Sequence, residues 1–370
     1  MGAVAAVTGG ARLPSWGEPV PWFRAQALSG NPAYAFDTAA GRPMLLLFFG
    51  SAAQAACAAA LAQVSANRAL FDDVRGCFFG VTIDPSDERQ GRIAQQIPGL
   101  RFFLDYDRAV SRMFGASDGD AYIPFWLVVD RQLRVTGRFN LAEAEQAFAC
   151  FMAMTEKAAD NGSAPVLIAP HVLEPELCRH LIALYDMNGG EESGFMREVE
   201  GKTVGLVDPA HKRRADITIE DENLRRALMV RVHNRLVPLI ERAFQFRATR
   251  MERYIVACYD SAAGGHFRAH RDNTTKGTAH RRFAVSINLN ADEFDGGDLC
   301  FPEFGPQLYR PPTGGAVVFS CSLLHEAKPV TRGRRFAFLP FLYDDAAAMI
   351  RERNNAYLGD NVSAYSQEEG

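Results

Sequence analysis

The first part of the chain alternates apolar runs with stretches of helical composition. The run MLLLFFG at 44–50 is continuously apolar, as expected of a strand buried on both faces. An alanine-rich stretch with helical character follows at 52–68. This βα alternation continues to residue 157 and predicts an α/β sandwich. The expected strands are 44–50, 77–84, 101–106, 123–130 and 134–139, the last two paired as a hairpin.

The second half of the chain has the opposite order, with helices first and strands afterwards. Leucines at helical spacing occur at 177–185 and again at 224–240. After Tyr254, short apolar runs are separated by Gly and Pro. This order predicts a sandwich or jelly roll backed by helices. The expected strands are RYIVACY, HFRAHRD, FAVSINLN, GDLCFP, GAVVFSC and RFAFLPFLY.

A polar segment separates these two patterns. The residues from Thr155 to Pro165 read TEKAADNGSAP, which is typical of a linker. We therefore expect two domains joined by a short connection. The expected boundaries are a first domain at 1–157, a linker at 158–164, a second domain at 165–350 and a C-terminal tail at 351–370.

Charge and cysteine content narrow the choice of partners and compartment. The 370 residues carry 40 basic and 44 acidic side chains, a balance that does not favour nucleic acid or an anionic membrane as partner. No apolar run reaches the roughly 18 residues of a membrane span, and the N-terminus lacks the basic start of a secretory signal. Seven cysteines at irregular spacing favour a reducing cytoplasm over a disulfide scaffold. We expect a cytoplasmic protein, and its oligomeric state stays open.

The clearest local signal for chemistry is the pair His270 and Asp272, which stand two residues apart. Residues at this spacing in a strand face the same side, so an imidazole and a carboxylate can point at one position. They supply two of the three ligands of the facial triad that holds non-haem Fe(II). The best candidate for the third ligand is His325, which follows GAVVFSC. The alternative is a surface pair in a loop that binds no metal.

Two further features favour a buried ligand site in the β-rich half. In SINLN, Ser286, Asn288 and Asn290 share one strand face, and such a face inside a β-domain needs a wet cavity or a ligand. Arg335 begins an apolar strand, where a buried guanidinium needs an anionic partner such as a dicarboxylate. The alternatives are a solvent-facing edge strand for SINLN and a surface ion pair for Arg335.

Together, these segments resemble the prolyl 4-hydroxylase-like Fe(II)/2-oxoglutarate-dependent dioxygenases. The matching motifs are VACY, HFRAHRD, SINLN, GGDLCFP and HEAKPVTRGRR, within about residues 165–350. Their spacing is specific, because His325 lies 53 residues after Asp272 and Arg335 lies ten residues further on. The resemblance implies a double-stranded β-helix, or jelly roll, with supporting helices.

The resemblance also implies a role for each matched residue. His270, Asp272 and His325 are the expected iron ligands, with no catalytic side chain beyond them. Arg335 is expected to bind the distal carboxylate of 2-oxoglutarate, and Tyr259 to help hold that molecule. Asn288 stands where the oxygen-sensing prolyl hydroxylases have a tyrosine, so we expect a cosubstrate-binding pocket of different shape.

The activity implied by this resemblance is hydroxylation, with 2-oxoglutarate and O2 consumed and succinate and CO2 released. Use of L-ascorbate, which restores oxidised iron, is implied as well. A protein or peptide prolyl residue is the usual substrate of the family, and free amino acids and small metabolites stay open.

Residues 14–157 resemble the peroxiredoxin and thioredoxin-like fold. Cys57 begins a helix after a strand, a place where a thiol can have a lowered pKa and a redox role. However, Gly50 and Gln54 replace the proline and threonine of peroxiredoxins, and there is no C-x-x-C. We therefore expect a non-catalytic domain. Pro124 matches a cis-proline position of that fold.

Two other functions compete with the dioxygenase. One is a thiol peroxidase that uses Cys57 and carries an accessory β-domain, and the other is a non-enzymatic sensor of iron or 2-oxoglutarate. The basic cluster Lys212-Arg213-Arg214 is either a solvated loop or part of a substrate entrance. His266 and His280 are expected to be solvated loop histidines, and the alternative is that one of them is a fourth group near the iron.

Overall fold

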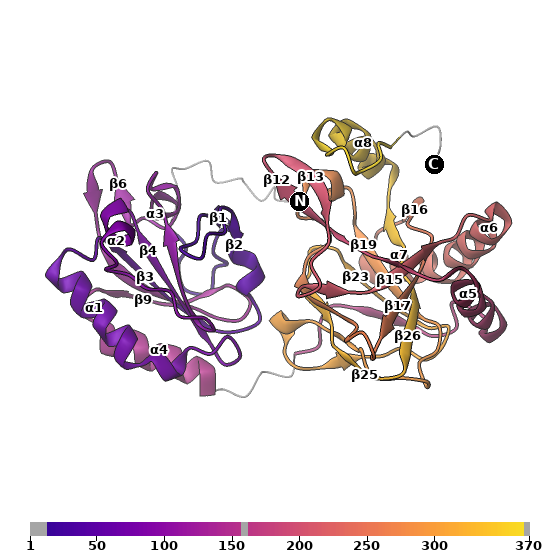
Figure 1. Ribbon diagram of the computed structural model, residues 1–370, viewed down its shortest axis with the longest axis horizontal. Helices are drawn as coiled ribbons and strands as arrows, with labels where there is room; N and C mark the ends of the chain where they lie inside the picture. The colour runs from indigo at the N-terminus through magenta and orange to yellow at the C-terminus, as the bar shows by residue number, and fades with distance from the viewer. Residues whose placement is uncertain (1–12, 157–161, 366–370) are drawn as a thin grey trace, which may run out of the picture. The chain divides into compact units, whose positions relative to one another are not determined.

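The computed structural model describes residues 13–156 and 162–365. The chain divides into two compact units, Met1–Asp160 with Pro302–Gly305 and Asn161–Phe301 with Pro306–Gly370 (Figure 1). The predicted linker at 158–164 lies mostly outside the described residues. No helix within the described ranges is long and apolar enough to cross a membrane.

The N-terminal unit is built on one mixed sheet in the order β5-β4-β3-β8-β9. The first three of these strands are parallel, and β8 and β9 form the predicted antiparallel hairpin beside β3. Every residue of β3 and β4 is buried, as in a strand covered on both faces. The strands are β3 (Met44–Gly50), β4 (Cys77–Thr82), β5 (Leu100–Leu104), β8 (Phe125–Val129) and β9 (Val135–Asn140).

Helices complete the α/β architecture of this unit. Cys57 and Val64 of α1 and Phe148 and Phe151 of α4 pack into the same core as the sheet. The helices are α1 (Ala55–Ala66), α2 (Pro85–Arg89), α3 (Ala109–Met113) and α4 (Ala144–Glu156). Short strand pairs are β1 (Arg24–Ala25) with β2 (Tyr34–Ala35) and β6 (Ser117–Asp118) with β7 (Ala121–Tyr122).

The expectation for Pro124 is wrong. In the described part of the chain, the cis peptide bond is Ile97–Pro98. Nothing in the local sequence distinguishes the two prolines, because the isomer of an X–Pro bond in a folded chain is selected by tertiary packing.

The C-terminal unit begins with strand β10, and strands β11 to β15 separate the two predicted helical stretches, so the expected order of helices first and strands afterwards is wrong. The stretch at 224–240 is not one regular helix, because a π-helical turn at Val232–Leu236 separates α6 from α7. Pro238 lies just after this turn, and because proline has no N–H it cannot continue the regular i→i−4 hydrogen bonds of the helix at this point. The helices are α5 (Pro175–Asn188), α6 (Glu222–Arg231), α7 (Val237–Phe244) and α8 (Asp345–Arg353).

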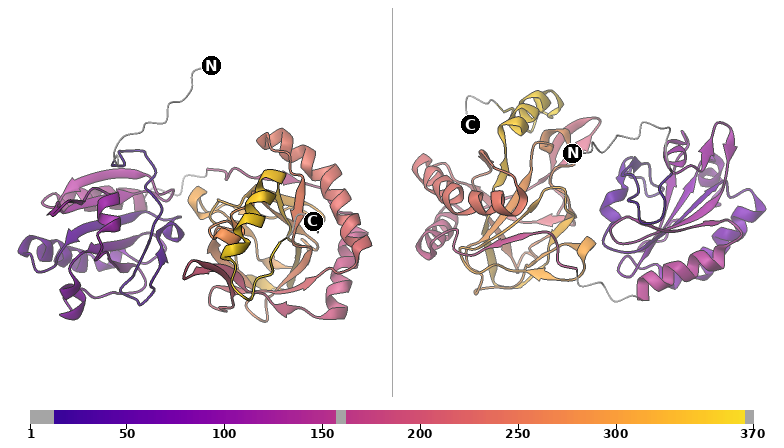
Figure 2. Two further views of the ribbon diagram at one scale, coloured as in Figure 1. Left: turned by 90° about the horizontal axis from the view of Figure 1, so that it is seen from above. Right: turned by 180° about the vertical axis from the view of Figure 1, so that it is seen from behind.

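Two antiparallel sheets form the body of the C-terminal unit, and Figure 2 shows their strands curving around a common interior with helices outside. This arrangement fits the predicted jelly roll. The larger sheet holds β10 (Leu167–Ala169), β11 (Glu191–Glu192), β15 (Ala215–Thr218), β16 (Arg250–Glu252), β17 (Ile255–Asp260), β19 (Phe283–Asn288), β23 (Ala316–Ser320), β26 (Arg334–Phe338) and β27 (Phe341–Tyr343). The smaller holds β14 (Lys212–Arg213), β18 (His266–His270), β21 (Leu299–Cys300), β22 (Leu308–Tyr309) and β24 (His325–Ala327). Separate hairpin-like pairs are β12 (Phe195–Val199) with β13 (Lys202–Leu206) and β20 (Asp295–Gly296) with β25 (Val330–Arg332).

The strands at the middle of the larger sheet have two different faces, because successive side chains alternate between them. In β17, Val256 and Cys258 join the hydrophobic core that also contains residues of α5, α6 and α7. The alternate residue Tyr259 points to the opposite face, because successive side chains of a strand alternate. The same alternation turns Ser286 of β19 and Arg335 of β26 away from the helices. The sheet therefore presents an apolar face to the helices and a partly polar face to the interior of the roll.

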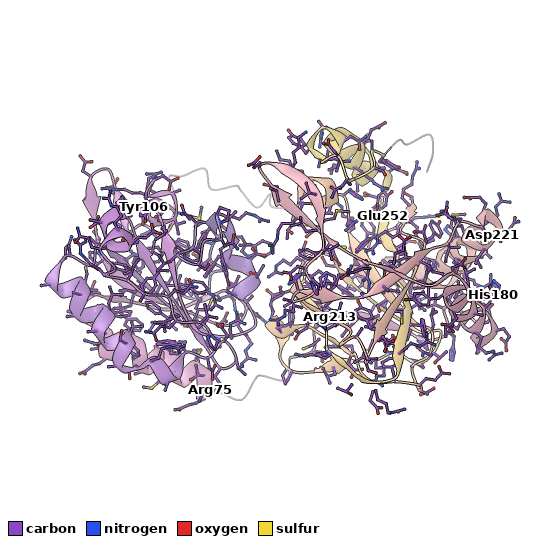
Figure 3. The ribbon with its side chains drawn as sticks, in the orientation of Figure 1. Arg75, Tyr106, His180, Arg213, Asp221 and Glu252 are labelled. Atoms are coloured by element: carbon purple, nitrogen blue, oxygen red, sulfur yellow. The ribbon has the colours of Figure 1, made fainter. Side chains whose placement is uncertain are left out.

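A buried carboxylate with its own cations stabilises the C-terminal unit at β16. Glu252, labelled in Figure 3, is 8% exposed and lies 2.7 Å from Nε of Arg281, 2.7 Å from Nη2 of Arg351 and 3.1 Å from Nε2 of His280. His280 is itself buried, so the expectation of a solvated loop histidine is wrong. Burial alone would raise the pKa of Glu252, but the facing cations hold it well below its usual range.

We expect Glu252→Gln to lower the free energy of unfolding by about 3 kcal/mol at neutral pH, because it leaves buried cations without their counter-charge. The ionised carboxylate stabilises the fold above the unfolded-state pKa of about 4.3, and this contribution is lost as the pH falls further. The difference between wild type and variant should therefore narrow below that pH in urea unfolding curves.

The matched control is Glu176→Gln, because the Glu176 side chain is 77% exposed in its pair with Arg179. Exposed pairs contribute up to about 1 kcal/mol. A Glu252→Gln effect no larger than this control, or one independent of pH, would contradict the assignment.

Candidate metal centre

Two neighbouring strands of the smaller sheet position the histidines. His270 is the last residue of β18 and His325 the first of β24, and the two are direct cross-strand partners. Asp272 lies in the turn beyond β18, where its N–H donates to the carbonyl of Cys321 at 2.9 Å. The expectation that His270 and Asp272 share one strand face is therefore wrong in detail. The turn, and not strand alternation, brings the carboxylate beside the imidazoles.

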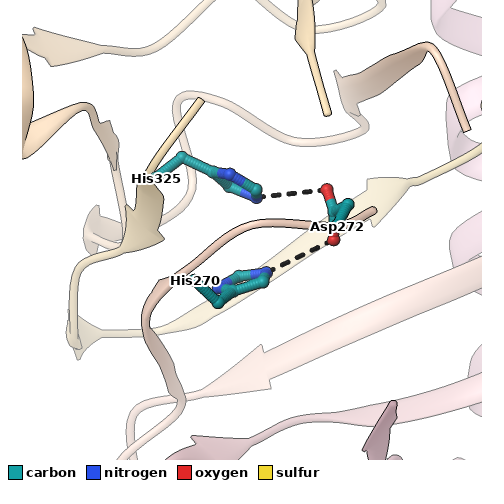
Figure 4. A group of neighbouring side chains, drawn as sticks. All are labelled: His270, Asp272 and His325. Atoms are coloured by element: carbon teal, nitrogen blue, oxygen red, sulfur yellow. Dashed lines mark ion pairs between the residues drawn. The ribbon is translucent and has the colours of Figure 1, made fainter. Parts of the chain in front are cut away.

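The three side chains converge on one position, as Figure 4 shows. Nε2 of His270 lies 3.5 Å from Oδ1 of Asp272, and Nε2 of His325 lies 3.3 Å from Oδ2. All three potential ligand atoms lie within 4.8 Å of one another. Two imidazoles and one carboxylate in this arrangement have the composition of the facial triad that suits non-haem Fe(II).

Hydrogen bonds set the tautomer of both histidines. Nδ1 of His270 lies 2.8 Å from the carbonyl of Arg268, and Nδ1 of His325 lies 3.0 Å from that of Leu323. A carbonyl only accepts, so each Nδ1 carries the proton and each Nε2 presents a lone pair toward Asp272. Burial, together with His325, lowers the pKa of His270 to about 4, which keeps this imidazole neutral near pH 7. Lone pairs that face a carboxylate in this way fit a cation.

Aromatic rings hold the two imidazoles in place. Phe267 stacks on His270 with ring centroids 3.5 Å apart, and Phe319 packs against His325 at 4.5 Å. Such packing restricts the orientation of both imidazoles and keeps the wall around them apolar.

The predicted dicarboxylate ligand Arg335 lies on the wall of the same pocket. It is 3% exposed, and its Nη2 donates to Oγ of Ser286 at 2.9 Å while Nε donates to Oδ1 of Asn288 at 3.4 Å. Its guanidinium carbon lies 5.2 Å from the ring centroid of Tyr259, its cross-strand partner. Among the described residues, no carboxylate lies within salt-bridge distance of Arg335. The surface ion pair considered for this residue is therefore excluded, and a buried cation is left without an anion.

Asn288 lies beside this cation. Its side-chain nitrogen donates to the carbonyl of Pro311 at 2.9 Å, and its oxygen accepts from Arg335. Ser286, by contrast, lines the pocket directly. Both residues are buried in β19, which lies between β23 and β26 in the sheet, so the alternative of an exposed edge strand is wrong.

Of the two further basic residues on the pocket wall, sequence reasoning missed Arg253, whereas Arg214 belongs to the basic cluster predicted as either a solvated loop or part of a substrate entrance. Arg214 and Arg253 both line the pocket. Arg214 and Lys212 are buried, and the exposed Arg213 lies in β14, so the solvated-loop alternative for the basic cluster is wrong. A usable signal was the spacing of Arg214 and Asp216, which places opposite charges on one strand face. No comparable signal marks Arg253.

In the N-terminal unit, Cys57 is 1% exposed. Its thiol donates to the carbonyl of Phe49 at 3.1 Å and lies 3.9 Å from Oε1 of Gln54. Burial, reinforced by the charge of Asp87, raises the pKa of this thiol. These contacts favour the thiol over the nucleophilic thiolate.

Part of the chain is similar in sequence to a known family of oxygenases. Residues 254–343 match the family model of the 2OG-Fe(II) oxygenase superfamily. A PKHD-type hydroxylase of Verminephrobacter eiseniae is 30% identical over 118 residues, which are 29% of this chain and 52% of that protein. A PKHD-type hydroxylase of Paraburkholderia phymatum is 40% identical over 82 residues, covering 20% of this chain and 36% of that protein. The chain thus spans about half or less of the length of these curated relatives.

Two solved structures each match part of the chain. A prolyl hydroxylase of Trichoplax adhaerens, solved with a peptide of hypoxia inducible factor, has a TM-score of 0.38 and 19% identity over 50% of this chain and 86% of its own. The peroxidoxin BcpB of Mycobacterium tuberculosis has a TM-score of 0.31 and 19% identity, and the match covers 38% of this chain and 98% of BcpB. The resemblance of the C-terminal half to the Fe(II)/2-oxoglutarate-dependent oxygenases, predicted from its motifs, is confirmed by the family match over residues 254–343.

Proposed function

We propose that this protein is an Fe(II)- and 2-oxoglutarate-dependent dioxygenase that hydroxylates a substrate and releases succinate and CO2. One observation carries the proposal: the His270, Asp272 and His325 cluster shares a pocket with the buried, anion-free guanidinium of Arg335. A metal site next to a carboxylate receptor is the combination that a chelating dicarboxylate requires.

Each side chain has a defined task in this proposal. The Nε2 atoms of His270 and His325 and a carboxylate oxygen of Asp272 hold the metal, and the Nδ1 hydrogen bonds keep both rings oriented. Arg335 binds the distal carboxylate of 2-oxoglutarate, with Ser286 and Tyr259 beside it. When bound, Fe(II) supplies the open positions at which 2-oxoglutarate and O2 react.

The substrate class and the reductant that we propose follow from the resemblance, and the compartment follows from the cysteines. A protein or peptide prolyl residue is the substrate class that the resemblance implies, and L-ascorbate is the reductant. Seven free cysteines are consistent with a reducing cytoplasm.

We further propose that the N-terminal unit is a thioredoxin-like domain without thiol peroxidase activity. The mixed sheet β5-β4-β3-β8-β9 with its helices supports the fold. The raised pKa of Cys57 and the replacement of the expected proline and threonine by Gly50 and Gln54 support the absence of peroxide chemistry.

His325→Ala should weaken Fe(II) binding more than about 100-fold, since the loss of even an outer-shell partner of a metal ligand costs roughly 10–100-fold. Anaerobic titration with Fe(II) measures this. The matched control is His266→Ala. The ring of His266 bonds to the carbonyl of Gly264, so this substitution should leave the Fe(II) affinity unchanged. In a metal-bound structure, the three ligand atoms should lie about 2.0–2.3 Å from the ion. Equal metal affinity of the two variants would contradict the site.

Arg335→Ala should weaken 2-oxoglutarate binding by roughly 2–5 kcal/mol, because the distal carboxylate loses its buried partner. Iron affinity should change little, and Arg335→Lys should keep part of the binding, since charge remains but the fork geometry does not. Binding is measured on the Fe(II) protein without oxygen, and succinate release in air. Arg334→Ala is the matched control, because that side chain is 45% exposed and pairs with Asp186. Unchanged 2-oxoglutarate affinity in Arg335→Ala would overturn the assignment.

Cys57→Ser should leave succinate release unchanged, and the wild type should consume peroxide no faster than the variant. The reason is that a buried thiol with a raised pKa supplies little thiolate. Peroxide consumption and chemical trapping of sulfenic acid measure this, with the half-buried Cys150 as an internal comparison. A fast, saturable peroxide reaction with sulfenic acid trapped at Cys57 would revive the thiol peroxidase.

A further inference from the structure

A second cation, Arg253, lies at the opposite end of the pocket from Arg335. The register of β17 and β26 pairs Tyr259 with Arg335 and Val256 with Phe338. Arg253 precedes Val256 and therefore belongs to the far end of this strand pair. It lines the pocket there together with Leu339, Pro340 and Phe341, which follow β26 in the chain.

The guanidinium of Arg253 has no committed partner. Its shortest ion pair is 3.7 Å, from Nη2 to Oδ2 of Asp216. That carboxylate is already engaged by Arg214, at 2.7 and 2.6 Å, and by the hydroxyl of Ser193 at 2.5 Å. Within the described ranges, no hydrogen bond is made by the Arg253 guanidinium, and its other contact is the ring of Phe341 at 5.3 Å.

Among the described residues, the charges around the pocket leave Arg253 with only the shared carboxylate of Asp216, at 3.7 Å. Arg214 and Asp216 neutralise each other. Once Fe(II) and 2-oxoglutarate are bound, their charges are balanced by Asp272 and Arg335. Burial and the nearby Arg214 lower the pKa of Arg253 to about 10, so the group is still charged at neutral pH. The Arg253 side chain is 29% exposed and its nearest carboxylate is 3.7 Å away, so an anionic ligand can make the direct, charge-assisted contact that the protein does not supply.

The backbone at this position is unusual as well. Arg253 has φ of 66°, in the left-handed region that residues other than Gly, Asn and Asp rarely adopt. Such conformations persist where the surrounding structure enforces them, and they concentrate at sites that hold ligands. Here the turn between β16 and β17 places Arg253 on the pocket wall, next to the apolar Leu339, Pro340 and Phe341.

We propose that Arg253 binds a carboxylate of the substrate that the enzyme hydroxylates. The apolar part of that substrate packs against Leu339, Pro340 and Phe341. The inference rests on the proposed dioxygenase function and specifies its substrate class. The carboxylate belongs either to the reacting amino acid itself or to an acidic side chain next to it in a peptide. Both sources present the same chemistry to a guanidinium.

Matched acid and amide probes test this inference and separate the two sources. N-acetyl-L-proline is compared with N-acetyl-L-prolinamide, and acetyl-Glu-Pro-amide with acetyl-Gln-Pro-amide. Binding is measured by calorimetry on the full chain loaded with Mn(II) and 2-oxoglutarate, which does not turn over. In at least one pair the acid should bind about tenfold or more tightly than its neutral partner, as expected for a charge-assisted contact.

Arg253→Met should abolish this preference, and Arg253→Lys should keep part of it because the charge remains. Arg242→Met, on the exposed face of α7, is the matched control and should keep the full preference. Unfolding midpoints of all variants report whether the fold is intact, and Arg253→Lys keeps the test valid if Arg253→Met is unstable.

Two results overturn the inference. The first is a wild type that binds acid and neutral probes equally or binds no acid probe. The second is an Arg253→Met variant that retains the preference for the acid. Metal and 2-oxoglutarate affinities are measured on the same samples. If the wild type binds both but shows no acid preference, only the substrate assignment fails, whereas failure to bind metal and 2-oxoglutarate overturns the proposed function itself.

Discussion

Side-chain alternation in β17, β19 and β26 is the constraint on which the C-terminal unit depends. One face of these strands is buried against α5, α6 and α7, so its residues must be apolar. The other face lines the interior of the roll and carries Tyr259, Ser286 and Arg335. Because the two faces belong to the same strands, the packing that stabilises the sheet also fixes the direction of the polar groups. A shift of register by one residue would send the polar side chains into the core.

Buried charges in this unit fall into two groups. Glu252 is satisfied inside the protein by Arg281, Arg351 and His280, and such a cluster stabilises the fold without any ligand. The buried Arg335 and the partly exposed Arg253 have no comparable partner among the residues that the structure describes. The distinction is physical, since an unpaired buried charge is costly and is tolerated where a ligand completes it. The pocket thus holds a cation at each end, with the His270, Asp272 and His325 cluster on its wall.

The two units also differ in whether their buried polar groups come together as potential metal ligands. In the N-terminal unit, the thiol of Cys57 is satisfied by a backbone carbonyl, and burial raises its pKa. In the described part of this unit, Arg42 Nε, Gln95 Oε1 and Ser117 Oγ are buried without a hydrogen-bond partner, and no group of three potential metal ligands comes together there. The proposed function therefore uses residues of the C-terminal unit. In the N-terminal unit, the apolar faces of α1 and α4, including Cys57, pack into the hydrophobic core.

The sequence by itself determined the main strands of both units and the division into an α/β and a β-rich half, because apolar periodicity reports local geometry. Motif spacing led to the prediction of His270, Asp272, His325 and Arg335 as one set of site residues. The sequence did not determine which polar residues are buried. His280, Lys212 and Arg214 look like ordinary loop or surface residues in sequence, and only the packing of distant strands encloses them. The placement of Asp272 in a turn, beside a histidine 53 residues away, likewise depends on the register of β18 and β24. Long-range pairing decides burial and partners, and a local pattern carries no information about either.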